Sequence, residues 1–270
     1  MPTILNVEKS ILIPNNQETA RYLGYSKLSA PDSQIASLIE QAATQMHKII
    51  NPKAVFQDFE LEITFSTENQ NQENPIIKLK DTNFQLQSKD LYNNLKNCHK
   101  VYLLACTLGP QVDSLIRKTQ FTDQVMASVF QATGAMYIEE VVDFANNQIA
   151  QIEKNQNNSV RPRFSPGFGD VSLENQKHFF NLLPCSKIGL SLMDTLIMAP
   201  EKSVTAFIGI YKNNHWFIKK TDLCFKYSKS AKIKNILVYK RFLNEKTFSN
   251  FYSNVIKLYI HFFPRNNQNF

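Results

Sequence analysis

Apolar residues recur at intervals of three or four in several stretches of the chain, and this spacing is typical of amphipathic helices. One such stretch, SQIASLIEQAATQMHKII, begins at Ser33 directly after Asp32, and either of these two residues can serve as the N-cap of the helix. The longest stretch covers roughly residues 122–154. Further helices are predicted around ETARYLGY, in KDLYNNLKNC after Ser88, around QVDSLIRK, and from Ser172 to about Leu183.

Two other stretches, AVFQDFELEITFS and IIKLKDTNFQLQ, alternate apolar and polar positions as strands do. The polar loop STENQNQENP between them predicts an antiparallel pair. HKVYLLACTLGP and SVTAFIGI are apolar runs of strand length. We also expect a short strand around ILIP, a loop in QNNSVRPR, and a short helix in SLMDTLIMAP that ends at Pro200. Helices mixed with antiparallel strands, without regular alternation, predict an α+β fold rather than a doubly wound sheet.

The length and the hydropathy of the chain indicate a globular protein. A chain of 270 residues can bury a core without help from a metal or a disulfide. No apolar run approaches the ~20 residues that are needed to cross a bilayer. The N-terminal stretch MPTILNVEKSILIP lacks the basic, apolar and small-residue regions of a signal peptide. We therefore expect a cytoplasmic protein that does not associate with a membrane.

The net charge of +7 is concentrated at one end of the chain. Residues 211–270 hold 12 of the 30 basic residues but 2 of the 23 acidic ones, which leaves residues 1–210 with a net charge of −3. We predict a body over 1–210 and a divergent basic C-terminal extension over 211–270. Because the body is net negative, we expect no nucleic-acid partner. The extension fits three interpretations: an added helical segment, a changed reading frame, or a basic surface for an acidic electron donor.

Common catalytic and metal-binding motifs are absent from the sequence. The four cysteines include no C-x-x-C, and the five histidines include no H-x-x-H or H-E-x-x-H, so we expect no metal site. The sequence contains no G-x-S-x-G. The GFGD segment lacks the third glycine and the preceding strand of a dinucleotide-binding fingerprint. We interpret the cysteines as buried or incidental thiols.

The segment RPRFSPGFGDVSLENQ, residues 161–176, places two of the chain's seven glycines within three positions. Gly167 and Gly169 would let the main chain approach a planar ligand without interference from a Cβ atom. Arg163 offers a bidentate fork for a carboxylate or phosphate, and Phe168 offers a ring that can cover an apolar or stacked group. A ligand-binding loop and a purely structural turn both fit these residues.

Two features of the longest predicted helix also allow two interpretations. Glu139 and Glu140 fit either a solvated helix face or a contact with the hydroxyl groups or positive charge of a ligand. Gly134 lies inside the helix, where glycine costs about 1 kcal/mol relative to alanine. It therefore indicates close packing against another element or the close approach of a ligand.

RFSPGFGD, followed by SLENQKHFFNLL and IGLSLMDTLIMAPEKSVTAFIGI, resembles the S-adenosylmethionine-binding activation domain of cobalamin-dependent methionine synthase, in its free-standing, single-domain version. VYLLACTLGPQVDSLIRK and RYLGY look like the same proteins, and the resemblance covers roughly residues 10–210. It implies the fold of that domain, an antiparallel sheet with long helices.

The resemblance also implies a function. The protein is expected to bind S-adenosylmethionine and to support the reductive methylation, or reactivation, of cob(II)alamin in a partner. That partner would be a cobalamin-dependent methionine synthase lacking its own activation domain, or a related corrinoid protein, with flavodoxin or a similar protein as electron donor. Methyl transfer moves no proton, so no catalytic residue is expected in this chain. The alternative is a non-catalytic module that docks on a corrinoid protein or shields it.

The same resemblance implies the binding residues. Arg163 is expected to bind the carboxylate of S-adenosylmethionine, and Ser165 and Gly167 to offer main-chain contacts. Phe168 stands where the family usually has tyrosine, which retains a ring for stacking but loses a hydroxyl. Glu139 matches an acidic residue of the long helix that contacts the ligand. The sequence identifies no acidic partner for the ligand's amino group.

Overall fold

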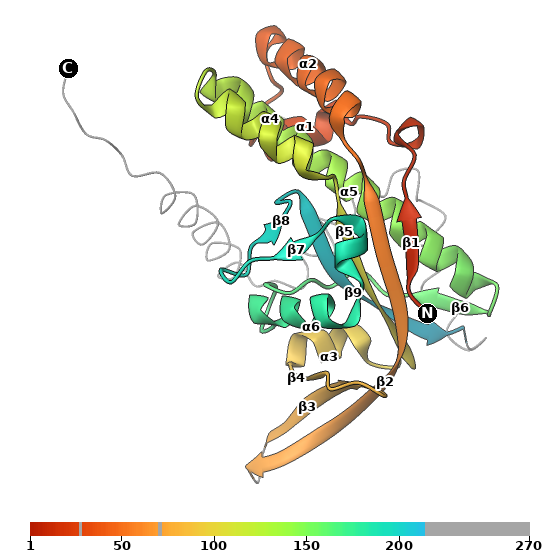
Figure 1. The fold of residues 1–270 in the computed structure, drawn as a ribbon. Coiled ribbons are helices and arrows are strands. Elements are labelled where there is room, and N and C mark those ends of the chain that lie inside the picture. The colour runs from red at the N-terminus through yellow and green to blue at the C-terminus, as the bar shows by residue number, and fades with distance from the viewer. Residues whose placement is uncertain (27–28, 70–71, 214–270) are drawn as a thin grey trace. The chain divides into compact units, whose positions relative to one another are not determined.

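A computed structural model describes residues 1–26, 29–69 and 72–213. Its central element is a seven-stranded antiparallel sheet. The strands follow the order β4-β3-β2-β5-β9-β6, and β1 pairs with β2 off this path (Figure 1). A separate hairpin consists of β7 and β8. The strands are β1 (Thr3–Asn6), β2 (Lys53–Asn69), β3 (Gln72–Leu79), β4 (Gln85–Gln87), β5 (Lys100–Thr107), β6 (Asn158–Val160), β7 (Ser191–Leu192), β8 (Met198–Ala199) and β9 (Ser203–Lys212).

The helices begin where the sequence offers a capping side chain. The Asp32 carboxylate accepts a hydrogen bond from the Ile35 N–H at 2.8 Å, and Ser88 Oγ accepts one from the Leu91 N–H at 2.9 Å. Of the two candidate caps of α2, Asp32 is thus the N-cap, and Ser88 is the N-cap of the helix predicted to follow it. The α-helices are α1 (Asn16–Tyr22), α2 (Ser33–Ile49), α3 (Lys89–Leu95), α4 (Pro110–Gln120), α5 (Gln124–Lys154) and α6 (Gln176–Leu182), and the 3-10 helices are η1 (Lys9–Ile11), η2 (Leu173–Asn175) and η3 (Cys185–Ile188).

Helices cover both faces of the sheet. Figure 1 shows α5 along one face, and α3 and α6 on the other. Alternate side chains of β5 belong to the two cores: Leu104 and Cys106 pack with α2 and α5, whereas Leu103 and Ala105 pack with α3 and α6. This burial on both faces explains the continuous apolar run of β5. The antiparallel sheet with helices on both of its faces confirms the predicted α+β class.

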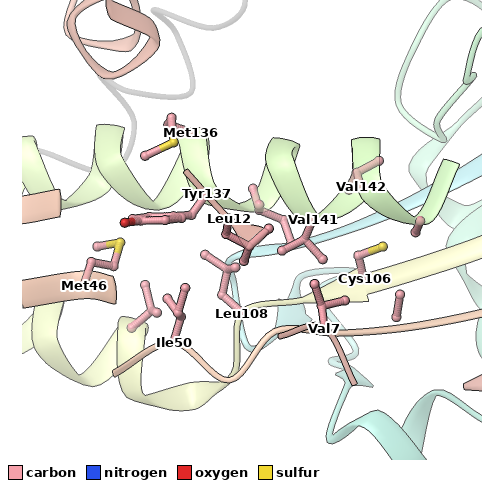
Figure 2. Close-up of a cluster of buried hydrophobic side chains, with 14 of the residues drawn as sticks. Val7, Leu12, Met46, Ile50, Cys106, Leu108, Met136, Tyr137, Val141 and Val142 are labelled. Carbon is pink, nitrogen blue, oxygen red and sulfur yellow. The ribbon is translucent and has the colours of Figure 1, made fainter. Parts of the chain in front are cut away.

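Tyr137 of α5 belongs to the buried cluster between the sheet and helices α2 and α5, with Met46 of α2 beside it (Figure 2). Its ring is fully buried, and its hydroxyl lies 3.2 Å from the Ala43 carbonyl oxygen and 3.3 Å from His47 Nδ1. Burial raises the pKa of Tyr137 to about 12. The hydroxyl thus has polar partners, which lowers the cost of placing tyrosine inside an apolar core.

Four predictions for irregular or polar segments were wrong. ILIP is not a strand: β1 ends at Asn6, and η1 precedes Leu12, which turns its side chain into the core. SLMDTLIMAP is not a helix, because β7 and β8 form a hairpin whose turn contains Leu196 at φ +65°. STENQNQENP is largely strand, and QNNSVRPR contains β6. In the last two, strand pairing through the main chain outweighs the polar composition of the side chains.

A buried polar network joins the start of β5 to the end of α5. The side chain of Glu153 has no exposed surface. It accepts hydrogen bonds from Lys100 Nζ at 2.7 Å, from the Tyr102 hydroxyl at 2.7 Å and from Asn158 Nδ2 at 2.8 Å. Burial alone would raise the pKa of Glu153, but the three hydrogen bonds outweigh it, and the pKa is lowered. The carboxylate is therefore held in its charged form.

The described part of the chain belongs to one unit, Met1–Asn213. The predicted extension over 211–270 falls outside the described residues from position 214 onward, as does Cys224. Of the other cysteines, Cys106 and Cys185 are buried and Cys98 is half-buried. Within the described ranges, no helix is both long and apolar enough to span a membrane. The same residues contain no cluster of three or more His, Cys, Asp or Glu suited to a metal ion.

Candidate functional site

Arg163 lies against α5 and contacts two of its carboxylates. Its Nη2 is 3.0 Å from Glu139 Oε2, and its Nη1 is 2.5 Å from Asp143 Oδ1. Glu139 and Asp143 are four residues apart, so they share one face of the helix. The three side chains are partly open to solvent, with 26% of Arg163, 44% of Glu139 and 50% of Asp143 exposed. The structure thus brings together Arg163 and Glu139, two predicted site residues from distant parts of the sequence.

Charges on α1 also act on this cluster. Arg21 pairs with Glu18 at 2.8 Å and lies over the ring of Tyr22 at 4.3 Å from its centroid. Partial burial raises the pKa of Glu139, and Asp143 adds to the rise, although Arg163 and Arg21 oppose it. The charged form of Glu139 is therefore less favoured here than in water. An additional cation near this carboxylate would stabilise it.

Residues 163–171, which we call the 163–171 loop, begin at the edge of β9. The Phe164 N–H donates to the Phe207 carbonyl at 3.0 Å, and the Phe207 N–H donates to the Phe164 carbonyl at 2.7 Å. Arg163 immediately precedes this bridge. Its backbone position is therefore fixed by strand pairing, and its side chain is fixed by α5.

The turn that follows explains the first glycine. Gly167 has φ +92°, and its N–H donates to the Val171 carbonyl at 2.8 Å. A Cβ atom at Gly167 would lie 3.1 Å from Leu173 Cδ2. The Phe168 N–H donates to the Ser165 carbonyl at 3.3 Å. These two N–H groups are used inside the turn and are therefore not available to a ligand.

Gly169 brings the turn against α3. It has φ +54°, and a Cβ atom at this position would overlap the carboxylate of Asp90. Glycine is required at Gly169 both for its left-handed conformation and for this close approach. The turn therefore has a structural reason for both of its glycines.

Substituting Gly169 tests this explanation. We expect Gly169→Ala to lower the free energy of unfolding by about 1–3 kcal/mol, from left-handed strain and from displacement of the Asp90 carboxylate. Urea unfolding would measure the loss. In the Asp90→Ala background the same substitution should cost less, because the overlap with the carboxylate is gone, whereas the left-handed strain and the close Cβ atom of residue 90, 3.0 Å away, remain. An equal loss in both backgrounds would contradict the proposed contact with Asp90.

The remaining predicted site residues lie further along the loop. Phe168 is 48% exposed, and Leu173, which is 47% exposed, borders the same turn at Gly167. Ser165 is half-buried. Of the two glutamates considered on the long helix, Glu139 is the one that contacts Arg163. Asp143 was not identified from the sequence. Its position four residues after Glu139 places both carboxylates on one face of the predicted helix, and this spacing could have indicated it.

Gly134 has a packing explanation. A Cβ atom there would lie 3.1–3.3 Å from the side-chain carbons of Lys202, which precedes β9. Burial lowers the pKa of Lys202. Of the two interpretations of this glycine, close packing against another element is the one that the structure supports.

Comparison with protein-family models gives no match, and a search of curated proteins gives none either. Among solved structures, the chain is similar to the crystal structure of the MetH reactivation domain bound to AdoHcy. The TM-score is 0.54 with 14% sequence identity, and the likeness covers 79% of this chain and 79% of that one. The arrangement of sheet and helices described above is therefore the fold of the MetH reactivation domain.

Proposed function

We propose that this protein binds S-adenosylmethionine beside Arg163 and supports the reactivation of a cobalamin-dependent methionine synthase. The observation that carries the proposal is the shared fold with the MetH reactivation domain, whose crystal structure contains AdoHcy, the demethylated form of S-adenosylmethionine. The contact between Arg163 of the RFSPGFGD segment and Glu139 of α5 adds support, because it brings two of the expected binding residues together on the surface.

The chemistry of the cluster fits the ligand. S-adenosylmethionine carries a carboxylate, an ammonium and a sulfonium, so its net charge at neutral pH is +1. Arg163, Glu139 and Asp143 together carry −1. The guanidinium can bind the ligand's carboxylate by exchanging one of its present partners. The carboxylate released in this way is then free to accept the ammonium, which supplies the acidic partner that the sequence did not identify.

The rest of the site would hold the nucleoside part of the ligand. The half-exposed ring of Phe168 offers a stacking surface for adenine, without the hydroxyl of a tyrosine. Ser165 and Gly167 would offer main-chain contacts on this side. Methyl transfer from a sulfonium moves no proton, so these residues bind and orient the ligand and exclude water, and none acts as an acid or base.

The methyl acceptor would belong to a partner protein. We propose a cytoplasmic methionine synthase that lacks its own reactivation domain, whose corrinoid supplies the nucleophile for the methyl group, and flavodoxin or a similar protein as electron donor. The protein's own part in this reaction is to present the sulfonium methyl group at an exposed face.

Isothermal titration calorimetry with S-adenosylmethionine and with AdoHcy tests the proposal directly. We expect both ligands to bind, S-adenosylmethionine more tightly because of its extra positive charge, and the difference to shrink as salt is added. Absence of binding at millimolar ligand would contradict the proposed function. Capture of a methionine synthase by the protein without any dependence on ligand would then favour a docking or shielding module.

A further inference from the structure

Helix α3 holds the 163–171 loop near both of its ends. Before the loop, Asn94 Nδ2 donates a hydrogen bond to the carbonyl oxygen of Pro162 at 3.0 Å. At the far end, Asp170 lies against the N-terminus of α3. Arg163 and the glycine-containing turn lie between these two attachments. The position of the turn therefore depends on how firmly α3 holds each end.

The attachment at Asp170 consists of several hydrogen bonds. Its carboxylate accepts from Ser88 Oγ, from the Lys89 N–H at 2.7 Å, and more distantly from the Asp90 N–H at 3.3 Å. The first N–H groups of a helix have no partner within it, and a carboxylate there is also favoured by the helix dipole. In return, the Asp170 N–H donates to Asp90 Oδ2 at 3.2 Å. Backbone and side chain of Asp170 are both engaged.

The core fixes α3 in turn. Leu91 and Leu95 of this helix are fully buried in the hydrophobic cluster on the face of the sheet that α3 and α6 cover. The turn itself is exposed at Gly167, Phe168 and Gly169. Asp170 thus connects an exposed turn to an element that cannot move without opening the core.

We propose that Asp170 is a positioning residue of the S-adenosylmethionine site, an inference that rests on the proposed function. Its carboxylate faces α3 and not the ligand. By tying the end of the 163–171 loop to α3, it sets where the ring of Phe168 stands relative to Arg163. Without this tie the turn samples other positions, and binding must then order it at the expense of affinity.

A ligand-free measurement tests the tie itself. In Asp170→Ala we expect the amide hydrogens of Gly167 and Val171, which are bonded inside the turn, to exchange faster than in the wild type. The matched control is Asp32→Ala, which removes a carboxylate from the N-terminus of α2 in the same way. This control should leave exchange in the turn unchanged. Equal exchange in the wild type and Asp170→Ala would overturn the proposal.

Calorimetry with S-adenosylmethionine tests the consequence for binding. We expect Asp170→Ala to raise the Kd about fivefold to tenfold. Asp170→Asn keeps an oxygen that can accept from Ser88 and Lys89, so it should restore part of the affinity. Asp32→Ala should bind as the wild type does, even if its Tm falls.

The outcomes separate the two proposals. Wild-type affinity in Asp170→Ala, in a protein that does bind S-adenosylmethionine, would overturn the positioning role alone. Failure of the wild type to bind would overturn the proposed function, and the positioning role with it. Loss of affinity in both Asp170→Ala and Asp32→Ala, in proportion to lost stability, would also count against a specific role for Asp170.

Discussion

Glu153→Ala is expected to lower the free energy of unfolding by about 3–5 kcal/mol at neutral pH. The substitution removes the acceptor shared by Lys100, Tyr102 and Asn158. The side chain of Lys100 is only 14% exposed and would retain Asp58 at 3.4 Å as its remaining acidic partner. An ion that stays buried after losing its close partner is costly, which is why the expected effect is large.

Chemical unfolding in urea would measure this loss, with an exposed ion pair as the control. Glu60 and Lys80 lie 2.8 Å apart, but their side chains are 71% and 59% exposed. Because water screens such pairs, Glu60→Ala should leave the unfolding transition unchanged. A small effect of Glu153→Ala, comparable with that of Glu60→Ala, would contradict the role given to the buried network.

The network should also make stability depend on pH. The pKa of Glu153 is lowered from the ordinary value of 4.5 in the folded protein, so its stabilising contribution is fully present above the unfolded pKa. The contribution is lost as the pH falls through the folded pKa. We expect the difference in Tm between the wild type and Glu153→Gln to be constant from neutral pH to about pH 5 and to narrow below it. A difference that widens in acid would contradict this sign.

If S-adenosylmethionine binds at the proposed site, Arg163→Ala is expected to raise the Kd about 10- to 100-fold, because it removes a charged hydrogen-bond donor. Arg163→Lys keeps the charge but loses the planar fork, so its affinity should lie between that of the wild type and that of Arg163→Ala. The control is Arg117→Ala on the exposed surface of α4, which should not alter binding. Calorimetry measures affinity, and thermal unfolding shows that each variant is folded.

The pairing of Arg163 with two carboxylates makes the opposite result informative. If the ligand is held by Glu139 and Asp143 and not by the guanidinium, Arg163→Ala should strengthen binding, because it frees both carboxylates for the cationic groups. Glu139→Gln and Asp143→Asn would then weaken it. Wild-type affinity in all three variants would remove this cluster from the ligand site.

Much of the fold could be predicted because it depends on local patterns. The caps at Asp32 and Ser88 bond to N–H groups three residues away, so the sequence contains both partners. Helices bury β5 on both faces of the sheet. Only a strand inside a sheet that is covered on both faces needs a continuous apolar run, so the run itself predicted this position. The hairpin of β7 and β8 could not be predicted, because its turn depends on the left-handed conformation of Leu196, a residue that seldom adopts it.

For the candidate site, the sequence determined which residue types were present, and the tertiary structure decided which of them meet. The residues pointed to Arg163 and to a turn that needs its glycines, and the resemblance added Glu139. Only the packed structure showed that Asp143 contacts Nη1 of Arg163 and that Asp170 accepts hydrogen bonds at the N-terminus of α3. The physical reason is separation along the chain: Asp170 and Ser88 are 82 residues apart. No local pattern predicts contacts at such distances, which arise when α3 and α5 pack onto opposite faces of one sheet.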